Sequence, residues 1–171
     1  MIFLIFSLFV NKTVAGSECI IIKNPEQTDS TSKFEIEEPG YYCLDENLHA
    51  RFDLAHHSPE GRLIRIRSSD VVLDLRNHIL GRGILFKNPG GVAIEINANL
   101  KNITVKNGTV QDFDVGFYRG IARYTWGTKE KILKPIYDPE TKTFSFERDN
   151  IVITNVRFIN NKIDMKIKEK E

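Results

Sequence analysis

The sequence lacks an excess of charge of either sign. Its 24 Lys and Arg residues nearly balance 23 Asp and Glu residues, so the formal net charge is +1. Nucleic-acid binding depends largely on surplus Lys and Arg that neutralise phosphates, and this balance argues against such a partner. A long hydrophobic run is missing too. The apolar segment at 1–10 has half of the roughly 20 residues that a transmembrane helix needs, so we expect no membrane span.

Cysteine is scarce. The chain has only Cys19 and Cys43, and neither a CxxC pair nor a Cys/His spacing indicates zinc. Both lie just after the apolar segment, where an oxidising compartment would let them pair. The closed loop would then stabilise the fold by about 3 kcal/mol in the chain-entropy model. Two buried free thiols are the alternative.

The apolar N-terminus has the length of a signal-peptide core, and the small residues Ala15, Gly16 and Ser17 follow it. This pattern is typical of a cleaved secretory signal. No Lys or Arg precedes Ile2, so a hydrophobic N-terminal strand or cap is the alternative. We interpret residues 1–17 as a signal peptide, which predicts a secreted, periplasmic or extracellular protein.

Convincing helical periodicity is absent beyond two turns, whereas short runs alternate apolar and polar residues with period two. The clearest of these runs are residues 71–75, 92–96, 103–106 and 151–158. Each is rich in β-branched residues and closes on Asn, Gly or Asp, which is typical of strands bounded by turns. The sequence therefore predicts an all-β protein.

Several of these runs repeat. Residues 101–110 align with 149–158, so that an Asn, an Ile and a second Asn coincide. Residues 91–96 align with 114–118 at an offset of about 23, and 69–80 fits the first frame with Ile79 near the Val110 position. A unit of roughly 20–25 residues cannot bury its own apolar face, but stacked units bury a continuous core. Asn at the corners tolerates the left-handed conformation. We expect a short right-handed parallel β-helix, a solenoid.

The residues at 70–83, 91–96 and 101–116 resemble the first rungs of pectin-lyase-like β-helix proteins. The segment 36–44, which reads IEEPGYYCL, resembles the lead-in strand that precedes such rungs. The resemblance implies the fold and says little about activity, because that fold hosts lyases, hydrolases and adhesins.

The expected organisation follows from these boundaries. A signal peptide at 1–17 precedes an N-terminal cap with lead-in strands at 18–68, and β-helix rungs occupy 69–168. A loop insertion at 119–148 interrupts the rungs. Within it, residues 134–137 and 143–146 flank a turn at 138–141, which predicts a β-hairpin projecting from the coil.

The insertion also carries the candidate ligand site, because long loops are often functional. Its aromatic rings could form a platform for a sugar ring, and its arginines could bind uronate or sulfate groups. The alternative is that the aromatics bury the hairpin against the rungs. The candidate ligand-binding residues are Arg119, Arg123, Tyr124, Trp126 and Tyr137.

Other chemistry-bearing residues are better explained by structure. Asp53, His56, His57 and Glu60 could suggest a metal, but they lack a ligand spacing and we interpret them as a solvated loop. In the segment 65–67, alternation places both arginines on one face and Ile66 on the other.

Three polar residues, Asp74, Glu95 and Lys106, alternate with apolar ones and are interpreted as outward positions. We find no recurring paired carboxylates and no phosphate-binding loop. No catalytic residue, metal or cofactor is expected.

Three hypotheses remain. The first is a secreted β-helix module without catalytic activity, which binds carbohydrate or has a cell-surface or structural role. The second is the N-terminal part of a polysaccharide lyase or glycoside hydrolase whose catalytic rungs lie beyond residue 171. The third is an assembly protein that associates with itself through its exposed C-terminal coil.

Overall fold

The computed structural model describes residues 18–23, 34–50, 61–82, 91–120, 136–146 and 149–167. Within these ranges the chain forms strands β1 to β14 and no α-helix, so the expectation of an all-β protein is confirmed. No helix in the described ranges has the length and apolar character needed to cross a bilayer.

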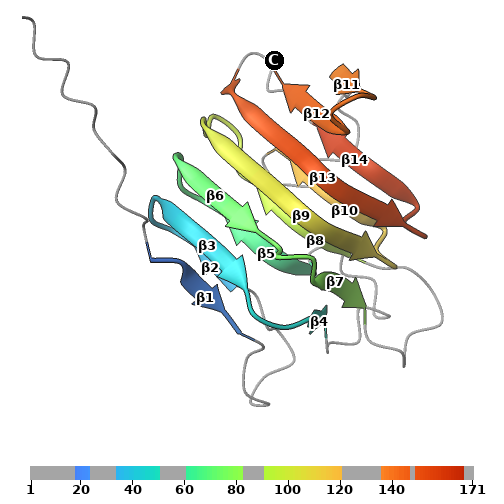
Figure 1. Cartoon of the computed structure of the whole chain (residues 1–171), viewed down its shortest axis with the longest axis horizontal. Helices are drawn as coiled ribbons and strands as arrows, with labels where there is room; N and C mark the ends of the chain where they lie inside the picture. The colour runs from blue at the N-terminus through green and yellow to red at the C-terminus, as the bar shows by residue number, and fades with distance from the viewer. Residues whose placement is uncertain are drawn as a thin grey trace, which may run out of the picture.

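The strands form two sheets, which lie one in front of the other in Figure 1. Five strands of sheet A run parallel, side by side, in the order β1 (Ile20–Ile22), β3 (Gly40–Leu44), β6 (Val71–Asp74), β9 (Ile103–Gln111) and β13 (Ile151–Ile159). Two short strands extend the same sheet, β4 (Leu48–Ala50) and β7 (Ile79–Arg82), of which β7 also pairs with β9.

Sheet B is parallel throughout. Its order is β2 (Phe34–Ile36), β5 (Arg62–Ile66), β8 (Val92–Ile96), β10 (Val115–Arg119) and β14 (Ile163–Ile167). The chain returns repeatedly from one sheet to the other, so that β3, β6, β9 and β13 stack in turn in sheet A, and β2, β5, β8, β10 and β14 stack in turn in sheet B. This alternation is why parallel strands can be neighbours without hairpins.

The core consists of columns of apolar residues that are in register across each sheet. In sheet A, Leu73, Val105 and Ile153 lie opposite one another, and all are buried. In sheet B the residues between the column positions are buried as well, including Leu63 and Ala93. The central strands of sheet B, β5, β8 and β10, are therefore largely buried on both faces, whereas sheet A has one polar face.

Asn and Asp residues occupy the corners in the left-handed conformation, as the repeats predict. Asp70, Asn102 and Asn150 have φ values of 60°, 56° and 50°, and they stack directly on one another. The amide of Asn150 donates to Asn102 at 3.0 Å, and the amide of Asn102 donates to Asp70 at 2.7 Å. Asn tolerates this backbone region at lower cost than most residues, so one residue supplies both the bend and the bond between turns.

The registers that the repeats predict are confirmed. Ile103 lies opposite Ile151, and Val92 lies opposite Val115. Ile79 lies opposite Thr109, while its neighbour Leu80 takes the position opposite Val110.

The expected repeat of 20–25 residues is wrong for most turns of the chain. Corner residues that bond to each other are 32 positions apart between Asp70 and Asn102, and 48 apart across the insertion. The early turns are longer because each contains two strands of sheet A, such as β6 and β7, before the chain reaches sheet B.

The expected hairpin forms from β11 (Ile136–Asp138) and β12 (Thr143–Phe146), with Tyr137 opposite Phe144. It does not project from the sheets, however. Strand β12 pairs antiparallel with β13, so the hairpin continues sheet A at its C-terminal side. The reason is packing: Phe144 lies opposite Ile153 and packs against the core.

A disulfide joins Cys19 to Cys43, with their Cα atoms 6.0 Å apart. This confirms the pairing considered from the sequence. The bond fastens β1, a three-residue edge strand, to β3, where Ile21 lies opposite Cys43. A strand this short contributes little by itself, so the disulfide holds the N-terminal edge of sheet A.

Candidate functional site

Most of the ligand-binding residues expected from the sequence cannot be placed. Arg123, Tyr124 and Trp126 lie outside the described residues, as do the segment 1–17, expected to be a signal peptide, and Asp53, His56, His57 and Glu60. Of the expected ligand set, Arg119 and Tyr137 are described.

Arg119 has a structural partner. It ends β10, where only 8% of its side chain is exposed, and its guanidinium forms an ion pair with Asp149. The two residues flank the insertion, so the pair closes the insertion at its base. A buried, paired guanidinium is not available to a ligand without breaking this bond.

Tyr137 belongs to a different environment, at the outer strand of the hairpin. Its ring lies 4.5 Å from that of Phe144, which is 6.4 Å from the ring of Phe158. Tyr137 is 49% exposed. Among the described contacts, Arg119 and Tyr137 share none, so the structure does not bring them together into one site.

A better site lies on the polar face of sheet A. There a row of side chains crosses five adjacent strands, which we term the sheet A strip. Each member follows or precedes an inward core residue, so alternation turns it outward. Registers place Asp74 opposite Lys106, Lys106 opposite Thr154, and Thr154 opposite Thr143. The strip comprises Tyr41 on β3, Asp74 on β6, Lys106 on β9, Thr154 on β13 and Thr143 on β12.

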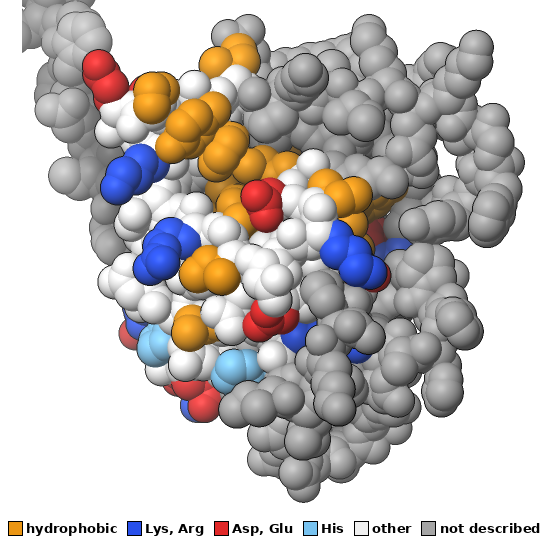
Figure 2. All heavy atoms as spheres, turned by 90° about the vertical axis from the view of Figure 1, so that its right-hand side faces the viewer, with side chains coloured by type: hydrophobic (Ala, Val, Ile, Leu, Met, Phe, Trp, Pro, Cys, Tyr) orange, Lys and Arg blue, Asp and Glu red, His pale blue; other side chains and the backbone are white. Residues whose placement is uncertain are grey.

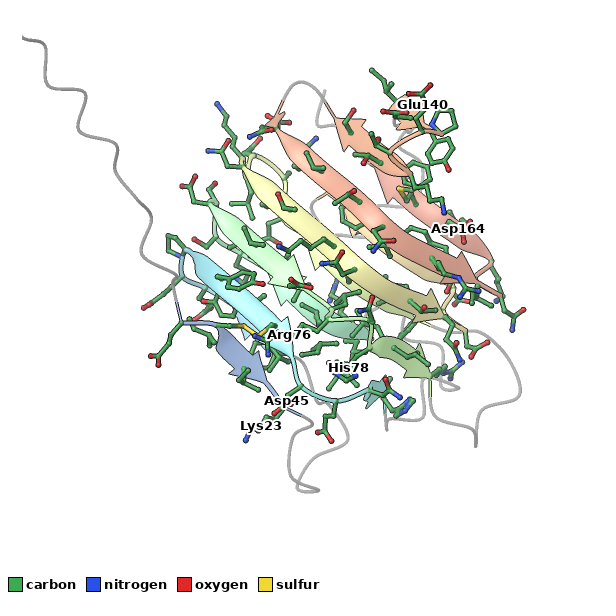
Figure 3. All side chains as sticks on the ribbon, in the orientation of Figure 1. Lys23, Asp45, Arg76, His78, Glu140 and Asp164 are labelled. Atoms are coloured by element: carbon green, nitrogen blue, oxygen red, sulfur yellow. A yellow bond between two sulfur atoms is a disulfide. The ribbon has the colours of Figure 1, made fainter. Side chains whose placement is uncertain are left out.

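Asp74 contacts two other members of the strip, Tyr41 and Lys106. Its Oδ2 accepts a hydrogen bond from the Tyr41 hydroxyl at 2.7 Å, and its Oδ1 accepts from the Arg76 backbone N–H at 2.9 Å and from Asn107 Nδ2 at 3.1 Å. Lys106 Nζ lies 3.4 Å from Oδ2. Figure 3 shows Arg76 beside this corner, where β6 ends.

These contacts set the ionisation of Asp74. Burial alone would raise its pKa. The hydrogen bonds from Arg76, Tyr41 and Asn107, together with the charge of Lys106, outweigh burial and lower the pKa of Asp74 below its ordinary value. The carboxylate therefore stays charged, and its oxygens serve to hold Tyr41 and Lys106 in place.

The remaining members offer an ammonium group and two hydroxyls. Lys106 Nζ lies 5.2 Å from the centroid of the Tyr41 ring, within cation–π range. The hydroxyls of Thr143 and Thr154 are 2.8 Å apart. The strip thus presents one ammonium group beside Asp74 and Tyr41, and a pair of hydroxyls on the neighbouring strands β13 and β12. This arrangement suits hydrogen bonding to an extended ligand rich in hydroxyl or carboxylate groups.

Glu95 alternates with the core residues Ile94 and Ile96, as expected of an outward position, but it is not exposed to solvent. It is fully buried and forms ion pairs with Arg62 and Arg65. Strand β8 is largely buried on both faces, which alternation alone cannot reveal. The alternation of acidic and basic residues at Glu35, Arg65 and Glu95, which lie opposite one another in neighbouring strands, could have indicated these ion pairs. The expected repeat of 20–25 residues does not place the three residues at equivalent positions.

The predicted arrangement of residues 65–67 is confirmed. Ile66 is in the core, while Arg65 and Arg67 both pair with Glu35, at 3.7 and 2.9 Å. Arg67 also pairs with Glu37 at 2.9 Å. These charges form a ladder across sheet B that joins β2, β5 and β8, which is a structural role.

Within the described ranges, no three His, Cys, Asp or Glu side chains are grouped so that they could hold a metal ion. Comparison of the chain with family models, curated proteins and solved structures finds no match. Function is therefore inferred from the chemistry of the sheet A strip.

Proposed function

We propose that this chain is a secreted, right-handed parallel β-helix module, similar to pectin-lyase-like proteins, that binds a polysaccharide without cleaving it. The alternation of the chain between two parallel sheets, with stacked Asn corners, supports the β-helix. The disulfide between Cys19 and Cys43 supports passage through an oxidising compartment.

The sheet A strip is the observation that carries binding. It is a row of polar side chains from five adjacent strands, and Lys106, on the middle strand, is 31% exposed. An ammonium group at this place favours an acidic sugar such as a uronate, because charge-assisted hydrogen bonds to carboxylates are the strong ones. Thr143 and Thr154 would bond to the hydroxyls of a neighbouring sugar.

Binding fits the strip better than cleavage. Glycosidases generally use two carboxyl groups, one of which transfers a proton. The strip contains one carboxylate, Asp74, and its oxygens already accept three hydrogen bonds and the charge of Lys106. Asp74 thus positions its neighbours.

Calorimetry with an oligogalacturonate tests the proposal. Lys106→Met should weaken binding on the order of tenfold, since it removes a charge-assisted hydrogen bond. Lys101→Met is the matched control, because Lys101 is exposed at a corner outside the strip, and it should bind as the unchanged chain does. Equal affinity for the two variants, or no binding by the unchanged chain, would refute the strip as a binding site.

The same mixtures distinguish binding from catalysis. We expect no new chain ends to accumulate in the oligosaccharide over prolonged incubation. Their accumulation would instead support the hypothesis of a lyase or hydrolase.

Secretion is tested separately by the intact mass of the protein purified from its source. A mass that begins near Gly16 or Glu18, with one disulfide before reduction, is expected. A retained Met1 with two free thiols would contradict export.

A further inference from the structure

A second row of side chains crosses sheet A beside the sheet A strip. It contains one residue from each of β6, β9, β13, β12 and β11, which are neighbours in the sheet (Figure 1). Registers place Val72 opposite Thr104, and Thr104 opposite Val152. They also place Val152 opposite Ser145, and Ser145 opposite Ile136. We term these five residues the second row.

The two valines of the second row point away from the core. Val72 precedes the buried Leu73, and Val152 precedes the buried Ile153. Successive side chains of a strand point to opposite faces, so both valines belong to the face that carries the sheet A strip. Both are half-buried, which leaves part of their apolar surface accessible beside the polar groups of the strip.

Ile136 extends the same face onto β11. Its neighbour Tyr137 stacks on Phe144, which packs against the core, so alternation turns Ile136 outward. Ile136 is 54% exposed. Figure 2 shows hydrophobic side chains gathered in the upper part of the face on the right of Figure 1, at the height of β11.

Apolar and hydroxyl side chains alternate along the second row from strand to strand. Val72, Val152 and Ile136 are on β6, β13 and β11, while Thr104 and Ser145 are on the intervening strands β9 and β12. Adjacent strands lie about 4.8 Å apart, so an apolar side chain recurs roughly every 10 Å. An extended polysaccharide advances by about one strand spacing per sugar. The period of the row therefore matches a repeat of two sugars.

The charges along the sheet A strip have the same period. Lys106 and the hydroxyl of Thr143 are on β9 and β12, the strands that also carry the hydroxyls of the second row. Asp74 is on β6, and Asp138 extends the strip onto β11, where it lies opposite Thr143. An acidic sugar is therefore favoured over β9 and β12 and disfavoured over β6 and β11.

We propose that the ligand is a polysaccharide in which acidic and neutral sugars alternate, which rests on the binding function proposed above. Its acidic sugars lie over β9 and β12, where Lys106 and the hydroxyls bind their carboxylates. Its neutral sugars lie over β6, β13 and β11, where the C–H faces of the rings pack against Val72, Val152 and Ile136. A chain of uronate alone places carboxylates beside Asp74 and Asp138.

Calorimetry with two hexasaccharides, both long enough to cross the five strands, tests the alternation. One alternates glucuronate with N-acetylglucosamine, and the other is hexagalacturonate. The unchanged chain should bind the alternating hexasaccharide on the order of tenfold more tightly, because this ligand makes the apolar contacts and avoids the like charges.

Val152→Thr and Ile136→Thr each remove an apolar contact and keep a β-branched side chain that favours a strand. Each should weaken binding of the alternating hexasaccharide about fourfold and make the heat-capacity change of binding less negative. Ile79→Thr is the matched control, because Ile79 is half-buried on β7, outside both rows. It should bind as the unchanged chain does.

Circular dichroism verifies that each variant is folded. The proposal is overturned if hexagalacturonate binds as tightly as the alternating hexasaccharide, if Val152→Thr and Ile136→Thr keep full affinity, or if Ile79→Thr loses as much. If neither hexasaccharide binds to the unchanged chain, the proposed function fails as well. If Lys106→Met weakens binding of both ligands and the unchanged chain prefers neither, the alternation alone is refuted.

Discussion

Arg119 and Asp149 form an ion pair that joins the two ends of the segment inserted between β10 and β13. Their side chains are 8% and 13% exposed, so water screens them little. The pair lets β13 stack on β9 in register even though 48 positions separate their corner residues. The insertion is thereby accommodated without disturbing the stack.

Arg119→Met should destabilise the fold by about 3–5 kcal/mol, because it leaves the carboxylate of Asp149 largely buried without its partner. Urea unfolding measures the loss. Lys162→Met is the matched control: Lys162 pairs with Asp114, but their side chains are 61% and 42% exposed, and such pairs contribute at most about 1 kcal/mol. Similar losses in the two variants would show that burial does not set the strength of the Arg119 pair.

Asp74 should make stability depend on pH in the acid range. The pKa of Asp74 in the folded protein lies below its ordinary value of 3.8. The carboxylate therefore contributes stability above that value, and the contribution is lost as the pH falls through the folded pKa. Asp74→Asn should lower the free energy of unfolding by about 1–3 kcal/mol at neutral pH, where it removes a charged acceptor.

The measurement is urea unfolding of both proteins as a function of pH. The difference in the free energy of unfolding between the two proteins should stay constant from neutral pH to about pH 5. It should then shrink toward about pH 2, as Asp74 of the folded unchanged chain is protonated. If this difference is unchanged at the lowest pH, the charge of Asp74 does not contribute to the stability of the fold.

Part of this fold could be predicted because the repeats recur in local sequence. Asn102 and Asn150 occupy equivalent corners and begin equivalent strands, so aligning the two segments gives the register of β9 and β13 directly. Period-two runs likewise identify the inward residues. The length of a turn could not be predicted, since the connections between sheets carry no repeated residues.

The sheet A strip was missed for a related reason. Its first contact joins Tyr41 to Asp74, and their proximity requires β3 and β6 to be neighbours in one sheet. The sequence around Tyr41 indicates a lead-in strand and contains nothing that fixes its partner. The burial of Glu95 was missed because alternation gives the face of a residue but not whether that face is covered.

The Asn corners should contribute in two separable ways. Asn102→Gly keeps the left-handed backbone, with φ at 56°, but removes the side-chain bonds to Asp70 and from Asn150. We expect a loss of about 1–3 kcal/mol for the two bonds. Asn102→Ala should lose a further 1 kcal/mol or so, because alanine is strained in this region. Thermal or urea unfolding of the pair gives both contributions, and equal stability of the two variants would argue against backbone strain.

Gly108 should tolerate no side chain, because β9 approaches the neighbouring corner closely there. A Cβ atom at this position would lie 2.4 Å from the Leu75 Cβ and 2.8 Å from the His78 carbonyl oxygen. Both atoms are fixed by the backbone, and the N–H of Thr109 donates to that same carbonyl. Gly108→Ala should therefore cost about 1–3 kcal/mol, as overpacking usually does.

Gly81→Ala provides the comparison on β7, the strand beside β9. There the nearest atom is His49 Nδ1, at 3.2 Å, which belongs to a side chain and not to the backbone. Its effect on the free energy of unfolding should stay within about 1 kcal/mol. If Gly81→Ala proved the more damaging, the close contact of β9 with the Leu75–His78 corner would not be the constraint that selects glycine at position 108.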